Sequence, residues 1–236
     1  MFTTDDQVLK SLSISLKYAA IFVPLNMIIA LVLAMLISQP VKGAKFFRTI
    51  FYIPAVISGV AVSIIFGWLL NGNYGVINYL LSLLGIDGPQ WLVDPKWAII
   101  AVIFASAFGV GSMMLIFYTD IKNIPIDLYE AAAIDGVNAW QKFWKITFPL
   151  AAPGIVSTSV FAFINAWNDY MIAYTFMKDQ SKYTLPVWLS SFSTPTMGTD
   201  FGGQMAASVT FSLPVVVFFM LIQRNIMKGV TTGAVK

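Results

Sequence analysis

Five long apolar runs, almost free of charged residues, constrain this chain more than any other feature. The first, residues 18–41, contains no Asp, Glu, Lys or Arg, and it is long enough to cross a hydrocarbon core of about 30 Å as a helix. The chain has 58% hydrophobic and only 11% charged residues, whereas soluble domains have about 25% charged residues. One globular core could not bury so much apolar surface. We therefore expect an all-α fold, a polytopic membrane helix bundle.

The apolar runs predict about five transmembrane helices that form a single domain over residues 1–236. The predicted spans cover residues of about 18–38, 49–70, 97–119, 154–177 and 205–223, and a charged loop at 120–153 separates the third from the fourth. Residues 1–17 are polar and carry Asp5 and Asp6, so they do not resemble a cleavable signal peptide. The chain is therefore expected to be an integral membrane protein that contacts lipid along most of its length.

The basic residues are divided unequally between the two sides of this bundle. Nine lie on the side of the charged loop: Lys42, Lys45, Arg48, Lys122, Lys142, Lys145, Arg224, Lys228 and Lys236. Five lie on the other side: Lys10, Lys17, Lys96, Lys178 and Lys182. The positive-inside rule then places the charged loop and the C-terminus in the cytoplasm. An odd number of spans leaves the N-terminus outside, so either the short tail crosses unaided or an earlier span is missing.

Several classes of function are excluded by composition. The chain has no cysteine and no histidine, which removes thiol chemistry, the usual metal ligand and the usual proton shuttle near neutral pH. No paired nucleophile and base is visible, so we expect no catalytic residue and no metal site. The net charge of +3 gives no reason to expect nucleic acid as a partner. No phosphate-binding G-x-x-x-x-G-K-[ST] motif is present, so the chain itself should bind no ATP.

The charged loop is patterned like two short helices. Pro125 suits the first turn of a helix, and Glu130 follows near its positive end. Gly136 would end this helix. Trp140, Phe143 and Trp144 then recur at spacings of three and four residues, which predicts one aromatic face on a second helix. Pro149 and Pro153 are expected to end that helix before the next span. Such a pair of helices could lie on the inner leaflet as an amphipathic hairpin, or it could dock onto another protein.

The spacing within this loop resembles a known signature: E-A-A, three residues, G, nine residues, then I-x-L-P. This chain has Glu130-Ala131-Ala132, Gly136 and Ile146-Thr147-Phe148-Pro149 at that spacing, with Phe148 in place of the usual Leu. The signature is typical of the permease subunits of binding-protein-dependent ABC importers. The resemblance implies an ATPase-coupling role for Glu130, Ala131, Ala132, Asp135, Gly136, Ile146 and Pro149.

The resemblance extends over most of the chain and points to sugar permeases of the maltose and glycerol-phosphate type. The segments FFRTIFYIPAVISGVAV, LLNGNYGVINYLL and DLYEAAAIDG resemble one of the two partner subunits of such importers. The segments FAFINAWNDYMIAYTFM and TLPVWLSSF, with the tail that ends in TTGAVK, resemble the other partner. Family members usually carry one more span before the region where this chain begins, which implies that the usual first span is absent here.

The resemblance also implies a set of partners and a location. A cytoplasmic ABC ATPase dimer would use ATP, a second permease subunit, identical or different, would complete the pore, and an extracytoplasmic solute-binding protein would deliver the sugar. The location would be a bacterial or archaeal plasma (inner) membrane.

One polar cluster interrupts the fourth predicted span. Asn165, Asn168 and Asp169 should share one helical face, with Trp167 and Tyr170 adjacent. Polar side chains within a membrane cost free energy and usually have a function. Sugars are commonly bound by amides, carboxylates and aromatic rings. We therefore predict that these five residues line the substrate pathway, although bonds between helices would also explain them. An ion-coupled secondary carrier or small channel remains the alternative function, but it would need charged relays in several spans.

Overall fold

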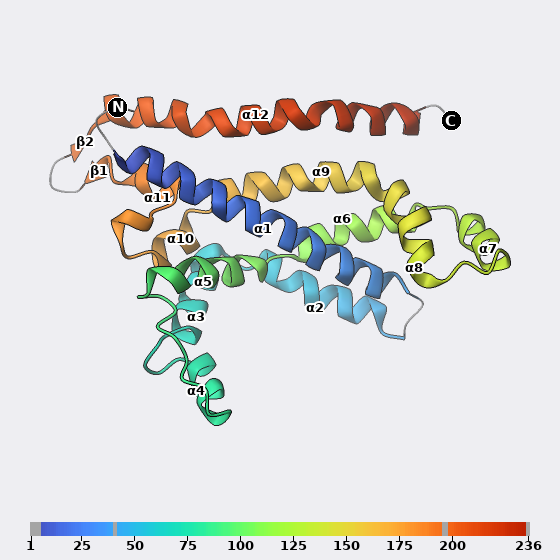
Figure 1. Ribbon diagram of the computed structural model, residues 1–236, viewed down its shortest axis with the longest axis horizontal. Coiled ribbons are helices and arrows are strands. Elements are labelled where there is room, and N and C mark those ends of the chain that lie inside the picture. Colours follow the sequence, from blue (N-terminus) through green and yellow to red (C-terminus); the bar gives the residue numbers. More distant parts are fainter. Residues whose placement is uncertain (1–5, 40–41, 195–197, 235–236) are drawn as a thin grey trace. The chain divides into compact units, whose positions relative to one another are not determined.

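The computed structural model describes residues 6–39, 42–194 and 198–234, and the side chains of the last segment up to Gln223. Its helices confirm the predicted all-α class (Figure 1). Two strands of two residues each, β1 (Ser193–Thr194) and β2 (Gly198–Thr199), form a short antiparallel pair. The side chains of the TTGAVK tail, residues 231–236, lie outside the described part of the structure.

The remaining elements follow one another along the chain. They are α1 (Asp6–Ser38), α2 (Ala44–Val56), α3 (Gly59–Leu69), α4 (Val76–Leu83), α5 (Pro95–Ala107), α6 (Gly111–Lys122), α7 (Ile126–Ile134), α8 (Ala139–Lys142), the π-helix η1 (Phe143–Thr147), α9 (Phe148–Trp167), α10 (Met171–Phe176), the 3₁₀-helix η2 (Gln180–Lys182), α11 (Leu185–Ser190) and α12 (Phe201–Ala234).

Five stretches of the described chain are candidates to cross a membrane. Three are helices that are long and apolar enough by themselves, namely Gln7–Ser38, Ala139–Phe176 and Phe201–Gln223. Two more are bent pairs of helices, α2 with α3 and α5 with α6, each of which qualifies as one broken span. All five overlap the apolar runs of the sequence, so the chain has the helical membrane architecture expected from composition.

The bends in the second and third spans were not expected from the sequence. The axes of α2 and α3 differ by 96°, and those of α5 and α6 by 52°. Pro54 lies inside α2, where its ring opposes the preceding turn and its nitrogen cannot donate a hydrogen bond. The helix ends two residues later, and the Ser58 hydroxyl then accepts from the Ala61 amide and caps α3. A proline followed by a capping serine therefore explains the sharper bend.

The helix of the first span also begins earlier than expected, at Asp6 rather than near residue 18. Val8, Ser11 and Ser15 are almost completely buried, and their spacing of three and four residues places them on one face. The Ser15 hydroxyl accepts a hydrogen bond of 2.7 Å from the Leu185 amide at the start of α11. Tertiary packing thus makes a helix of a segment that looks like a polar tail.

The chain divides into two compact units, which we describe separately. The first contains residues up to 22, 56–109 and 164–217. Its core includes Phe66 of α3, whose ring meets Phe104 of α5 edge to face with centroids 5.7 Å apart. Asn78 lies in α4, and its side-chain amide donates to the Gly72 and Pro89 carbonyls and accepts from the Trp91 indole. These bonds hold α4 at the far end of α3 (Figure 1).

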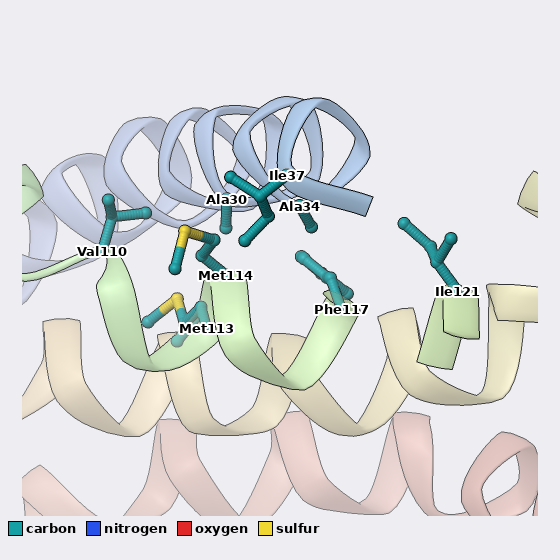
Figure 2. Packing of buried hydrophobic residues seen from close by; sticks show 9 residues of the cluster. Ala30, Ala34, Ile37, Val110, Met113, Met114, Phe117 and Ile121 are labelled. Carbon is teal, nitrogen blue, oxygen red and sulfur yellow. The ribbon is translucent and has the colours of Figure 1, made fainter. Parts of the chain in front are cut away.

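The second unit contains residues 23–55, 110–163 and 218 onward. Its core is formed by one face of α1, one face of α6 and a residue of α9 (Figure 2). The face of α1 presents Ala30, Ala34 and Ile37, and small residues at this spacing allow close helix packing. The other members are Val110, which directly precedes α6, Met113, Met114, Phe117 and Ile121 of α6, and Ala162 of α9. This core packs the end of α1 against α6, and the charged loop extends from the end of α6.

Two further contacts bind α2 to α6 in the second unit. A Cβ on Gly111 would collide with the Phe51 carbonyl, so only glycine allows this close approach. The Arg48 guanidinium lies 4.1 Å from the centroid of the Tyr118 ring, which is a favourable cation–π geometry.

Candidate functional site

The charged loop folds into a helix, a tight turn and a second helix, all within the second unit. In α7 only Ala132 is buried, at 5% exposure, whereas Glu130, Ala131 and Asp135 are exposed. The helix therefore packs on its own unit through Ala132 and the partly buried Tyr129, and it presents most of its remaining surface outward. In Figure 1 α7 and α8 lie together beyond the end of α6.

Gly136 makes the turn after α7. Its φ of +69° lies in the left-handed region, which costs other residues about 1–2 kcal/mol. The Gly136 amide donates to the Ala133 carbonyl, and the Val137 amide donates to the Ala132 carbonyl. These two bonds form a Schellman motif. No atom lies within 4 Å of a Cβ built on Gly136, so the glycine is needed for its backbone angle and not for space.

The second helix begins at once with a capping box. The Asn138 side chain accepts from the Gln141 amide, and the Gln141 side chain accepts from the Asn138 amide, an arrangement that satisfies two otherwise free donors. Because the Schellman turn and the capping box are separated by one residue, the angle between α7 and α8 is closely defined.

The predicted aromatic face is present on this second helix. The rings of Trp140 and Trp144 have centroids 5.8 Å apart, and Phe143 and Trp144 are 5.0 Å apart. Trp144 also contacts Phe148 at 5.0 Å. Trp140 is 69% exposed and Ile134, across the turn, is 87% exposed. Large apolar side chains left this open suggest a surface that another molecule covers.

The expectation that Pro149 and Pro153 end the second helix is wrong, because the chain continues from α8 through η1 into α9. In η1 the Phe148 amide donates to the Phe143 carbonyl, five residues back. This π-helical turn widens the helix just before Pro149, which then falls in the first turn of α9 and needs no amide donor. Pro153 lies deeper in α9, where membrane helices tolerate proline.

Ile146 and Pro149, the last residues of the signature, lie on this continuous helix. Ile146 is half-buried and Pro149 is exposed. Between them Thr147 is buried, and its hydroxyl lies 3.0 Å from the Tyr129 hydroxyl of α7. The bond joins the two helices, and no feature of the sequence indicated it.

The polar cluster of the fourth predicted span lies in the first unit, where the helix breaks between α9 and α10. Asp169 lies in this break. Its Oδ2 accepts hydrogen bonds from the Tyr18 hydroxyl at 2.8 Å and from the Ser106 hydroxyl at 2.6 Å. Tyr18 belongs to α1 and is 2% exposed, and Ser106 belongs to α5. The Asp169 carboxylate therefore joins three segments of the first unit.

The other predicted members of this cluster face in different directions. Trp167 is 1% exposed, and its indole donates to the Phe211 carbonyl at 3.0 Å. Asn165 and Asn168 are exposed, and the Asn168 amide donates to the Ile164 carbonyl in its own helix. Tyr170 stacks on Tyr174 of α10 with ring centroids 5.2 Å apart. The structure thus separates two exposed amides and a partly exposed tyrosine pair from the inward-directed Trp167 and Asp169.

Tyr18 and Ser106 were not predicted as partners of Asp169. Tyr18 begins the first apolar run and Ser106 is one of several small residues in the third, so neither stands out in the sequence. Among the described residues, no group of three or more His, Cys, Asp or Glu side chains is placed to hold a metal ion.

A family comparison matches most of the chain. Residues 22–232 match the family described as binding-protein-dependent transport system inner membrane component. The probable ABC transporter permease protein YesP of Bacillus subtilis (strain 168) is 40% identical over 182 residues, which are 76% of this chain and 59% of that protein. The diacetylchitobiose uptake system permease protein DasC of Streptomyces coelicolor is 42% identical over 116 residues, 49% of this chain and 42% of that protein. The trehalose transport system permease protein SugB of Mycobacterium tuberculosis is 35% identical over 171 residues, 71% of this chain and 61% of that protein. The chain thus spans less than two thirds of the length of these relatives.

Solved structures share the fold. A chain from the crystal structure of a bacterial ABC transporter involved in the import of the acidic polysaccharide alginate superposes with a TM-score of 0.85 at 20% identity, covering 96% of this chain and 81% of that one. A chain from the complex of the bacterial alginate ABC transporter with an alginate pentasaccharide-bound periplasmic protein gives a TM-score of 0.82 at 21% identity, covering 93% and 78%.

Proposed function

Because the chain belongs to the family of binding-protein-dependent transport system inner membrane components, we propose that it is the permease subunit of an ATP-driven carbohydrate importer. Membership of this family makes the chain a transport component and not an enzyme. The substrate class is inferred from relatives such as DasC and SugB, whose names specify diacetylchitobiose and trehalose.

The observation that carries the proposal is the exposed helix-turn-helix formed by α7, Gly136 and α8. We propose that it couples this chain to a separate cytoplasmic ATPase dimer. A contact that transmits movement must be stiff, and here the Schellman turn, the capping box and the bond between Tyr129 and Thr147 restrict the two helices. Exposed Glu130 offers a charge to a basic partner, and Ile134 and Trp140 offer apolar area. Different contacts with two states of the ATPase would shift the permease between inward-facing and outward-facing forms.

The same proposal assigns the exposed part of the polar cluster to the substrate pathway. Asn165 and Asn168 would hydrogen-bond saccharide hydroxyls, and the stacked Tyr170–Tyr174 pair would provide a flat apolar surface for a sugar ring. Trp167 and Asp169 would not bind the sugar directly, because their polar groups are bonded within the protein. They would instead hold the pathway residues in place.

A second permease subunit, an extracytoplasmic solute-binding protein and the lipid bilayer complete the proposed assembly. The charged loop and C-terminus would face the cytoplasm, as the distribution of Lys and Arg suggests. The ion-coupled carrier is less favoured, because the only acidic side chain in the polar cluster, Asp169, is bonded to two hydroxyl groups of other helices.

Co-purification tests the coupling element. The full chain, affinity-tagged and isolated from membranes of its own host, should carry a nucleotide-binding subunit and ATPase activity. Glu130→Lys combined with Gly136→Asp should reduce that recovery at least about tenfold, because reversing an interface charge and straining the turn both weaken docking.

Asp87→Lys is the matched control, since Asp87 is exposed in the loop after α4 of the first unit, and it should leave recovery unchanged. Equal recovery with the double variant would remove the coupling role from α7 and α8. A complex that contained neither an ATPase nor a second permease would overturn the importer assignment.

A further inference from the structure

A groove of about 840 Å³ lies in the second unit, where α1 and α6 end and the charged loop begins. Its walls come from four segments: the end of α1, the end of α6 with the turn after it, α7, and the start of the second helix. The lining residues are Met35, Ser38, Gln39, Ile121, Lys122, Asn123, Ile124, Pro125, Ile126, Tyr129, Ala139, Lys142, Phe143 and Thr147.

The charged residues that line this groove are all basic. Lys122 ends α6 and Lys142 ends α8, so two lysines from different helices line the groove. Asn123 and Gln39 add amide donors, and none of the lining residues is acidic. The polar part of the groove is therefore complementary to an anion.

The rest of the lining is apolar and lies where two candidate spans end. Met35, Ile121, Ile124 and Phe143 contribute hydrocarbon surface. The candidate spans Gln7–Ser38 and the bent pair Lys96–Lys122 both end at the groove, and the ends of membrane-spanning helices lie next to the lipid headgroups. A soluble anion would use only the lysines, whereas a phospholipid would also cover the apolar wall with its acyl chains.

We propose that this groove binds one anionic phospholipid, with the headgroup phosphate between Lys122 and Lys142 and an acyl chain against Met35, Ile121 and Ile124. Basic pockets between membrane helices bind anionic headgroups in this way. Because the groove is built from the end of α6 and from the start of both loop helices, the lipid would contact the parts that the proposed coupling element moves. The site itself does not depend on the proposed transport function.

Direct titration tests the site. The full chain in detergent, stripped of native lipid, is titrated with a short-chain fluorescent phosphatidylglycerol, and a phosphatidylcholine analogue serves as the neutral headgroup. Lys122→Gln and Lys142→Gln should each weaken phosphatidylglycerol binding about fivefold, and together roughly thirtyfold. Lys96→Gln with Lys178→Gln, two exposed lysines of the first unit, is the matched control and should not change binding. Equal affinity of the loop double variant and the unmodified chain would overturn the proposal.

Two further arms separate the lipid from other occupants. Ile124→Ser should weaken phosphatidylglycerol without changing the effect of inorganic phosphate. Phosphate that displaces the lipid at low millimolar concentration, with Ile124→Ser binding normally, would make this a soluble-anion site and overturn the proposal. Loss of ATPase recovery with unchanged lipid binding in the lysine variants would instead assign the groove to a protein contact. If the glutamine variants unfold, Lys122→Arg with Lys142→Arg should fold and keep phosphatidylglycerol binding, and its failure to bind would count against the site.

Discussion

At the scale of single residues, the Asp169 carboxylate has the clearest structural role. It accepts from hydroxyls of α1 and α5, and a buried hydrogen bond to a charged acceptor contributes about 1.5–3 kcal/mol. Tyr18 is 2% exposed, so Tyr18→Phe preserves the ring and removes only the donor. We expect this variant to unfold at a lower temperature in detergent, with a loss of about 1–2 kcal/mol in the free energy of unfolding. Intrinsic fluorescence during heating measures the change.

Asn168→Ala is the matched comparison for this prediction. The Asn168 side chain is exposed, and within the described part of the chain its amide donates to the Ile164 carbonyl four residues earlier, so its loss should cost little stability. As a proposed pathway residue it should instead raise the KM of saccharide uptake several-fold. A Tyr18→Phe chain as stable as the unmodified one, or an Asn168→Ala chain that unfolds first, would contradict the division between inward and exposed members of the cluster.

The sequence alone indicates that placing Asp169 within a membrane costs free energy, but it does not indicate which groups Asp169 bonds to. Its partners are 151 and 63 residues away, and a serine or tyrosine in an apolar run carries no sign of its partner. The expectation that Asn165, Asn168 and Asp169 share one face assumed an unbroken helix. Because α9 ends at Trp167, the carboxylate turns inward while the amides remain exposed.

At the scale of elements, the π-helix η1 explains how proline fits into the second loop helix. The Phe148 amide reaches back five residues to the Phe143 carbonyl, so Pro149 follows a widened turn and lies in the first turn of α9. Deletion of exposed Lys145 should convert η1 to an α-helical turn and place Pro149 in a helix interior, which costs about 3 kcal/mol.

The same deletion in a Pro149→Ala background tests this explanation. Alanine has an amide donor and no ring, so the deletion should then lower the unfolding temperature much less. Pro149→Ala without the deletion is the control and should remain close to the unmodified chain. Equal losses in both backgrounds would show that η1 does not serve to accommodate the proline.

The pattern of prolines thus predicted a helix end where the structure has a widened turn, and in α2 the opposite occurred. There Pro54 was placed near the start of a continuous span, but the helix ends at Val56 and turns by 96°. Whether a proline ends a helix or is accommodated within it depends on the geometry of the neighbouring helical turn. The geometry of that turn is set by tertiary packing, which cannot be read from the spacing of residues in the sequence.

At the scale of the whole molecule, composition is sufficient for the class of fold and insufficient for its internal arrangement. Uncharged runs identify the five candidate spans because lipid admits few alternatives to a helix. The same rule cannot reveal that residues 7–17 pack as helix, since their contacts, such as Ser15 with Leu185, join distant parts of the chain. Nor does it indicate the two compact units, because each unit combines three separate segments.

The side of the membrane that the charged loop faces can be measured directly, because of the amino-acid composition of the chain. The chain has no cysteine, so a single introduced cysteine is the only thiol that a maleimide can label. The excess of Lys and Arg on the side of the charged loop predicts that this side faces the cytoplasm. Lys145→Cys should therefore react with a membrane-impermeant maleimide only after the membrane is permeabilised, whereas Asp87→Cys should react in intact cells. Both positions are exposed, so a difference in labelling reports the side of the membrane and not burial. Labelling of Lys145→Cys in intact cells would place the proposed coupling element outside the cell, where no ATP is available to an ATPase. That result would contradict the proposed importer function.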